Sequence, residues 1–172
     1  LLVNCKPFSS EEKSTGDKID QFIKTEKLNE KTILVTMGYD AMVAIATQKG
    51  IVVIDAGISP TLTTRYRKTI EKEFKQNDFA YLINTHSHPD HAGGNTIFSD
   101  ALIIGHENCP AEWAESNKDT GEVISGLQKT VSSYKKQLQT LKPGTSEWDE
   151  AFCQKTRYSY ALNDRLKNLV SP

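Results

Sequence analysis

The spacing of apolar and polar positions changes about two thirds of the way along this chain. In the first part, short apolar runs stand between turn residues, which is typical of buried strands. From residue 122 onward, apolar residues recur every third or fourth position, the spacing of an amphipathic helix. The pattern therefore predicts an α/β part followed by a helical part. The predicted strands are residues 31–36, 41–47, 51–54, 79–83 and 101–104.

Turn residues predict how these strands are connected. Gly38-Tyr39-Asp40 separates the first two strands and Gln48-Lys49-Gly50 separates the next two, so we expect antiparallel pairs there. A helix is predicted from Pro60 to about Gln76, because proline is favoured in the first turn of a helix. Since that helix lies between two strands, the antiparallel pairs should lead into β-α-β units.

Further helices are predicted on both sides of this region. Apolar residues within 17–28 share one helical face, and Asp17 can cap such a helix. Near the C-terminus, Lys142-Pro143-Gly144 separates two predicted helices, residues 122–141 and 146–169. One face of the last helix is expected to hold Trp148, Phe152, Leu162, Leu166 and Leu169.

Three parts follow from these patterns. Residues 1–16 are polar and predict a mobile lead-in, residues 17–118 form the α/β unit, and residues 119–172 form a helical hairpin. At 172 residues, with 37% hydrophobic and 25% charged residues, the chain suits one globular domain. The net charge of −1 gives no indication of a nucleic-acid partner, and no apolar run is long enough to span a bilayer.

The chain contains three cysteines, Cys5, Cys109 and Cys153. They are odd in number and widely spaced, so they predict no disulfide framework. The segment Leu1-Leu2-Val3-Asn4-Cys5 partly matches the end of a lipoprotein signal, and Asn before the Cys fits poorly. The location therefore stays open between cytoplasm and periplasm.

The segment from Thr85 to Asn95 carries the clearest chemistry in the sequence. It reads Thr-His-Ser-His-Pro-Asp-His-Ala-Gly-Gly-Asn and contains three of the four histidines of the chain. It directly follows the predicted strand 79–83, so the histidines should lie at the end of a buried strand. Imidazole and carboxylate side chains together suit zinc and neighbouring transition metals. The segment therefore predicts a metal-binding loop, which we call the metal loop.

The metal loop resembles the signature of the metallo-β-lactamase-fold hydrolases. Ile51–Gly57 resembles the family's upstream strand with its Asp-x-Gly turn, and Ala101–Glu107 resembles the strand and His-Glu pair after the metal loop. The resemblance covers about residues 31–110. It implies an α/β fold: the N-terminal half of an αββα sandwich, followed by the helical hairpin as an insertion.

The resemblance also implies a ligand set. In the family this loop gives two ligands to each of two metal ions, so His86 and His88 would serve the first ion, and Asp90 and His91 the second. The ion pair holds a hydroxide that attacks the substrate near neutral pH. Asp90 would orient this hydroxide and shuttle a proton. Zinc is the expected metal, and iron or manganese suits the same ligands.

Two other residues keep alternatives open. Family members use the acid corresponding to Asp55 to support the metal loop from behind its ligands. An ordinary turn aspartate at the end of a strand is the alternative. His106 follows the strand 101–104, and a local cap or packing role is favoured over metal binding.

The family's later half supplies further ligands and a second sheet that this sequence does not show. We therefore expect a fragment of a hydrolase that acts on a small molecule and is inactive by itself. Its apolar sheet should associate with the C-terminal half or with a second copy. The alternative is a non-catalytic module that keeps the metal loop for binding or assembly. The metal loop is compatible with lactam, thioester, phosphodiester and lactone substrates.

Overall fold

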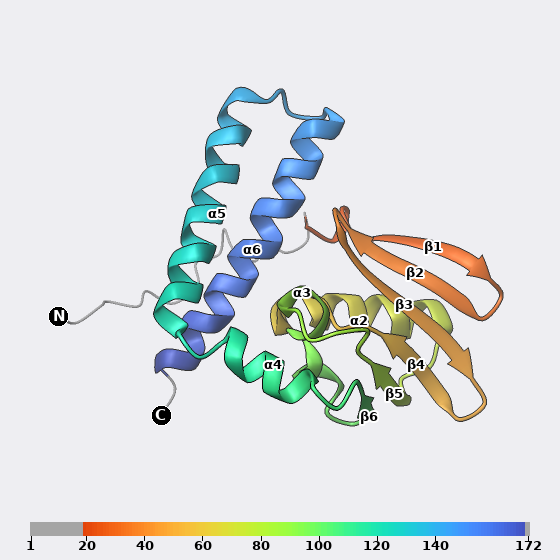
Figure 1. Cartoon of the computed structure of the whole chain (residues 1–172). Coiled ribbons are helices and arrows are strands. Elements are labelled where there is room, and N and C mark those ends of the chain that lie inside the picture. Colours follow the sequence, from red (N-terminus) through yellow and green to blue (C-terminus); the bar gives the residue numbers. More distant parts are fainter. Residues whose placement is uncertain (1–18, 171–172) are drawn as a thin grey trace.

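The computed structural model describes residues 19–170 and contains one six-stranded mixed sheet with helices around it (Figure 1). The predicted lead-in of residues 1–16 and the segment Leu1–Cys5 lie outside the described residues. The strands follow one another across the sheet in chain order. They are β1 (Lys24–Asn29), β2 (Thr32–Met37), β3 (Asp40–Thr47), β4 (Gly50–Ile54), β5 (Phe79–Ile83) and β6 (Leu102–Ile104).

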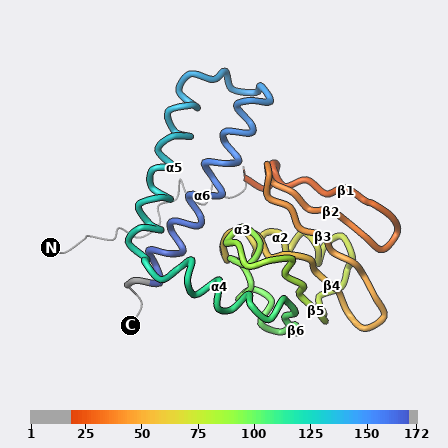
Figure 2. Tube along the Cα trace, viewed as in Figure 1, coloured from red at the N-terminus to blue at the C-terminus, as the bar shows by residue number. Residues whose placement is uncertain are grey.

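Strand direction changes in the middle of the sheet. The pairs from β1 to β4 are antiparallel, whereas β4–β5 and β5–β6 are parallel. The carboxyl ends of the three parallel strands therefore meet at one edge, where the metal loop follows β5. The helical elements are α2 (Pro60–Phe74), α3 (Pro89–Ala92), η1 (Asn95–Phe98), α4 (Cys109–Ser116), α5 (Thr120–Thr140) and α6 (Ser146–Val170). The trace in Figure 2 shows α3 and α4 between the hairpin and this edge.

The five predicted strands and the α2 helix are confirmed, with ends shifted by one or two residues. The predicted helix over residues 17–28 is wrong from Lys24 onward, because residues 24–29 form β1, and its predicted cap Asp17 lies outside the described residues. β1 pairs antiparallel with β2, and its charged residues remain mostly exposed at the sheet edge. Charges on an edge strand hinder pairing with another chain. Ile19 is buried, so part of the apolar spacing reflects packing against the core and not a continuous helix.

The two faces of the sheet differ in burial. On one face, residues such as Ile33, Val35 and Val53 pack with Leu62 and Tyr66 of α2 in a fully buried core. The opposite face is also apolar, but its side chains stay half-exposed or exposed. It consists of Leu34, Val43, Ile45, Val52, Ile54, Tyr81, Ile83, Leu102 and Ile104, which pair across the strands in register.

The two long helices form the predicted hairpin, and α6 packs against both α5 and α2. On α5 the stripe around the buried Val131 is confirmed. On α6 the predicted face is partly wrong, because Leu166 is 39% exposed. The buried side of α6 instead carries Ala151, Cys153, Gln154, Thr156, Arg157 and Ala161.

Hydrogen bonds also join the hairpin to the sheet region. The backbone N–H and the hydroxyl of Thr61, in the first turn of α2, donate to the Asp164 carboxylate of α6 at 2.9 and 2.6 Å. The division of the chain at residue 119 stays a prediction. None of the helices within residues 19–170 has the length and apolar character that crossing a membrane requires.

Candidate metal centre

The turn after β4 forms the base of the metal loop. Asp55 has a φ of 63°, a left-handed conformation that is uncommon for a residue other than glycine. The Asp55 N–H donates to the Ile83 carbonyl at 2.9 Å, and the Ala56 N–H donates to the His91 carbonyl at 2.7 Å. The turn therefore holds the start and the end of the metal loop at once.

The Asp55 carboxylate, only 7% exposed, lies under the loop. One oxygen, Oδ1, accepts from the Thr85 N–H at 2.8 Å, and both oxygens lie within 3.0 Å of the Thr85 hydroxyl. The other oxygen, Oδ2, lies 2.8 Å from His91 Nδ1. Because a carboxylate only accepts hydrogen bonds, His91 carries its proton on Nδ1 and leaves Nε2 free as a ligand atom.

Through Thr85, the Asp55 carboxylate also fixes the tautomer of His86. Its hydroxyl has one proton, which it donates to Asp55, and its oxygen lies 2.9 Å from His86 Nδ1. His86 Nδ1 is then the donor, so Nε2 of His86 is also left free. One buried carboxylate thus orients two imidazoles, as carboxylates behind metal-binding histidines do.

The loop brings its histidines together. The ring centroid of His86 lies 4.0 Å from that of His91 and 4.6 Å from that of His88. The half-exposed Asp90 carboxylate lies beside them, with Oδ2 3.7 Å from His91 Nε2. This separation is close to the ~3.4 Å between two ligands of one tetrahedral ion with bonds of about 2.0–2.1 Å.

These residues fit a transition metal in donor type and orientation, but they are incomplete in number. Within residues 19–170, no three His, Cys, Asp or Glu side chains have the geometry to hold one ion. Zinc sites usually have three or four protein ligands. By itself, the loop therefore falls short of the number of ligands that a zinc site usually has.

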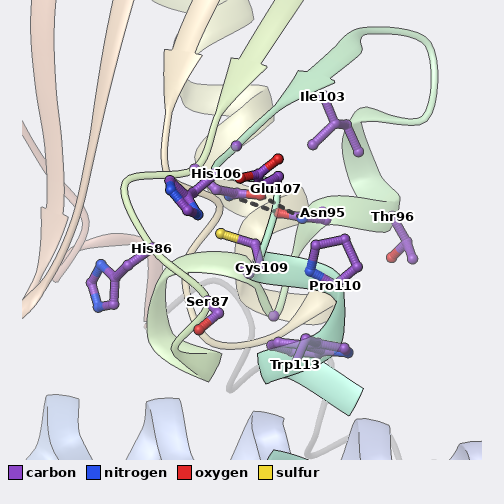
Figure 3. Close-up of a pocket in the computed structure, with 14 residues that line it drawn as sticks. His86, Ser87, Asn95, Thr96, Ile103, His106, Glu107, Cys109, Pro110 and Trp113 are labelled. Atoms are coloured by element: carbon purple, nitrogen blue, oxygen red, sulfur yellow. Dashed lines mark hydrogen bonds between the residues drawn. The ribbon is translucent and has the colours of Figure 1, made fainter. Parts of the chain in front are cut away.

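A cavity of about 480 Å³ opens beside His86, between β6 and α4 (Figure 3). Trp113 of α4 forms part of its wall, together with His106. Nδ1 of His106 accepts from the Asn108 N–H at 3.2 Å, which is the local capping role favoured from the sequence. The Ser87 hydroxyl donates to Glu112 of α4 at 2.7 Å and so ties the metal loop to this wall.

A buried charged group lies behind the loop. Asp40, 2% exposed, accepts from the Tyr66 hydroxyl at 3.3 Å and lies 3.7 Å from Nη2 of Arg157 on α6. Burial raises the pKa of Asp40 from 3.8 to about 6, while Arg157 and Tyr66 act in the opposite direction and the charge of Asp90 adds to the rise. Sequence patterns gave no signal for this group, because its members come from β3, α2 and α6.

The raised pKa of Asp40 predicts a pH-dependent stability. Between the unfolded and folded pKa values, the folded state binds the proton more strongly, so the free energy of unfolding falls as the pH rises through this range. The slope from one group is at most about 1.4 kcal/mol per pH unit. Denaturant unfolding from about pH 4 to pH 7 should show wild type losing stability relative to Asp40→Asn. A difference that stays constant with pH would contradict this expectation.

Comparisons with known proteins agree with the fold. A model of the metallo-beta-lactamase superfamily matches residues 37–157, which include most of the sheet, the metal loop and the first half of α6. The chain therefore belongs to the metallo-beta-lactamase superfamily. The match extends beyond residue 110, the limit of the resemblance read from the sequence, and enters the hairpin.

One curated relative is the 2,4-dinitroanisole O-demethylase subunit alpha of Nocardioides sp. (strain JS1661). It is 31% identical over 94 residues, which are 54% of this chain and 29% of that protein. The sec-alkylsulfatase Pisa1 from Pseudomonas sp. has a TM-score of 0.51 at 16% identity, over 63% of this chain and 18% of that chain. A metallo-beta-lactamase from Pontibacter korlensis has a TM-score of 0.48 at 21% identity, over 56% and 48%. The chain thus spans less than half the length of each.

Proposed function

We propose that this chain carries the metal loop of a metal-dependent hydrolase. The observation that supports this most directly is the Asp55 carboxylate. It orients His91 directly and His86 through Thr85, and leaves the Nε2 atom of each ring free. Surface histidines without a common ligand have no need of a buried carboxylate behind them. Family membership supports the same function.

In this proposal His86 and His88 hold one ion, Asp90 and His91 hold the second, and Asp55 supports the loop. Zinc is the expected metal, with iron or manganese as alternatives. Such ions polarise the bond under attack and make a hydrolytic nucleophile available near neutral pH. Asp90 is half-exposed beside His91, where its carboxylate can orient a water molecule and accept its proton. The remaining ligands come from protein segments other than the metal loop.

The substrate is a small molecule whose class the loop does not define. By their names, one of the similar proteins demethylates 2,4-dinitroanisole and another is a sec-alkylsulfatase. A shared fold supports many reactions, because the walls of the pocket select the substrate and the metal loop does not. The half-exposed apolar face of the sheet is proposed to be covered by the rest of the protein or by a second copy.

Replacing Asp55 by asparagine tests the supporting role. The amide nitrogen of the new side chain would face the Nδ1 proton of His91 or the Thr85 hydroxyl, so at least one imidazole should change tautomer or rotate. We expect zinc affinity to fall by about 10- to 100-fold. Competition with a chromophoric chelator measures this. Asp78→Asn, at an exposed aspartate before β5, is the matched control and should keep wild-type affinity. Equal affinity in both variants would contradict the role of Asp55.

The function itself is tested on the complete gene product that contains this chain. Elemental analysis should find about two transition-metal ions per chain, in line with a two-ion hydrolytic site. An assay panel of lactams, thioesters, phosphodiesters, alkyl sulfates and aryl ethers should show hydrolysis that a chelator removes and added metal restores. A protein without metal after reconstitution with zinc, manganese and iron overturns the proposal. A protein that binds metal but hydrolyses nothing favours the non-catalytic module.

A further inference from the structure

Arg157 is a buried cation that reaches from the hairpin to the metal loop. It lies on α6, is 5% exposed, and places Nη2 3.7 Å from Asp40 Oδ1 and 3.9 Å from Asp90 Oδ2. Its guanidinium thus lies between a buried carboxylate and a proposed ligand. The two acids belong to β3 and α3, so Arg157 joins three elements far apart in the sequence.

The neighbours of Arg157 fix the position of its guanidinium but provide hydrogen-bond partners for only some of its N–H groups. Nη1 donates to the Gln154 side chain at 3.3 Å, and Nε is buried without a hydrogen-bond partner. Asp40 is itself held by the Tyr66 hydroxyl and by the backbone N–H of Ile58. A buried charge with incomplete hydrogen bonding is costly, and an apolar side chain would often serve stability as well or better. Packing alone therefore does not account for an arginine here.

Asp90 is the side chain whose orientation Arg157 restricts. It is the second residue of the four-residue helix α3, and its side chain is 45% exposed. The same oxygen, Oδ2, faces both Arg157 and His91 Nε2. A buried guanidinium on one side reduces the rotation open to this carboxylate and keeps it next to His91.

We propose that Arg157 is a positioning residue of the metal centre, which holds Asp90 in the orientation that binds the ion. The inference rests on the proposed function, because it assigns Arg157 a task at that site. It makes the hairpin part of the metal centre, since α6 supplies the side chain that orients a ligand on α3.

The test must separate orientation from charge, because removing a cation near a metal site by itself favours metal binding. Three variants of the complete gene product do this. Arg157→Lys keeps the charge but loses the planar fork of the guanidinium. Asp40→Asn/Arg157→Met removes both members of the buried pair and keeps the net charge. Asp40→Asn alone leaves Arg157 beside Asp90. Arg165→Met, also on α6 and bonded to Asn117, is the control for the helix.

Zinc affinity, the d–d spectrum of bound cobalt and the unfolding temperature of the metal-free protein are measured for each variant. We expect the double variant and Arg157→Lys to bind zinc about 10-fold more weakly and to change the cobalt spectrum. Asp40→Asn and Arg165→Met should keep wild-type affinity and spectrum. Wild-type affinity in the double variant would overturn the inference and leave Arg157 as a counterion of Asp40. A wild-type protein that binds neither zinc nor cobalt overturns the proposed function, and the inference with it.

Discussion

Replacing Gly94 by alanine should lower the free energy of unfolding by about 3 kcal/mol or more, because the chain is overpacked at this position. A Cβ there would overlap the Thr63 hydroxyl and the Ala56 carbonyl oxygen. The Gly94 N–H donates to the Gly57 carbonyl at 3.2 Å, so the loop cannot move away without losing this bond. Neither Gly93 nor Gly94 has a positive φ, and the glycines are required for close approach and not for a special turn conformation.

Gly126→Ala is the matched control for this prediction. Gly126 lies within α5, and a Cβ there meets nothing within 4 Å. Since alanine favours helix more than glycine does, this variant should be more stable than wild type by about 0.5–1 kcal/mol. Urea unfolding of both variants measures the two changes. Equal stabilities for Gly94→Ala and wild type would show that the loop and the Asp55–Gly57 turn do not pack as tightly as the structure indicates.

Replacing His86 and His91 together by alanine should remove the metal from the complete gene product. Each proposed ion then loses one of the two ligands that the loop provides, and Asp55 loses both imidazoles that it orients. Mutating residues that only support metal ligands typically lowers metal affinity or activity by about 10- to 100-fold. Because His86 and His91 are proposed ligands themselves, hydrolysis should fall by more than about 100-fold in this variant. Elemental analysis and the substrate panel check the two parts of this prediction.

His106→Ala provides the comparison for the double variant. His106 lines the same cavity as His86, but its ring makes a local bond to Asn108. Its metal content should therefore match that of wild type. If the variant lacking both His86 and His91 retained two ions and full activity, the ligands would lie elsewhere in the protein.

Local sequence patterns were sufficient where local forces dominate. Apolar runs between turn residues predicted all strands from β2 to β6, because turn chemistry and the short apolar runs of a strand act over a few residues. The metal loop was found in the same way, since its histidines and aspartate are close in sequence. The structure brings the three histidine rings together and places Asp90 beside His91.

The same reasoning failed where a distant partner decides the outcome. Lys24–Asn29 has no strong preference of its own and becomes a strand because β2 offers an unpaired edge. On α6, apolar periodicity pointed to Leu166, whereas the helix buries Gln154 and Arg157 because charged partners lie opposite Arg157. Helical periodicity cannot show which polar residues find a buried partner.

The sequence by itself determined the strands β2 to β6, the hairpin and the type of candidate ligand atoms, since each depends on residues close together in the chain. Tertiary structure alone decided how those ligands are oriented. Asp55 reaches Thr85 and His91 because β4 and β5 run parallel and end at one edge. Arg157 reaches Asp90 because α6 packs against α2 beside that edge. All three contacts join residues at least 30 positions apart, a separation at which only the folded chain brings such side chains together.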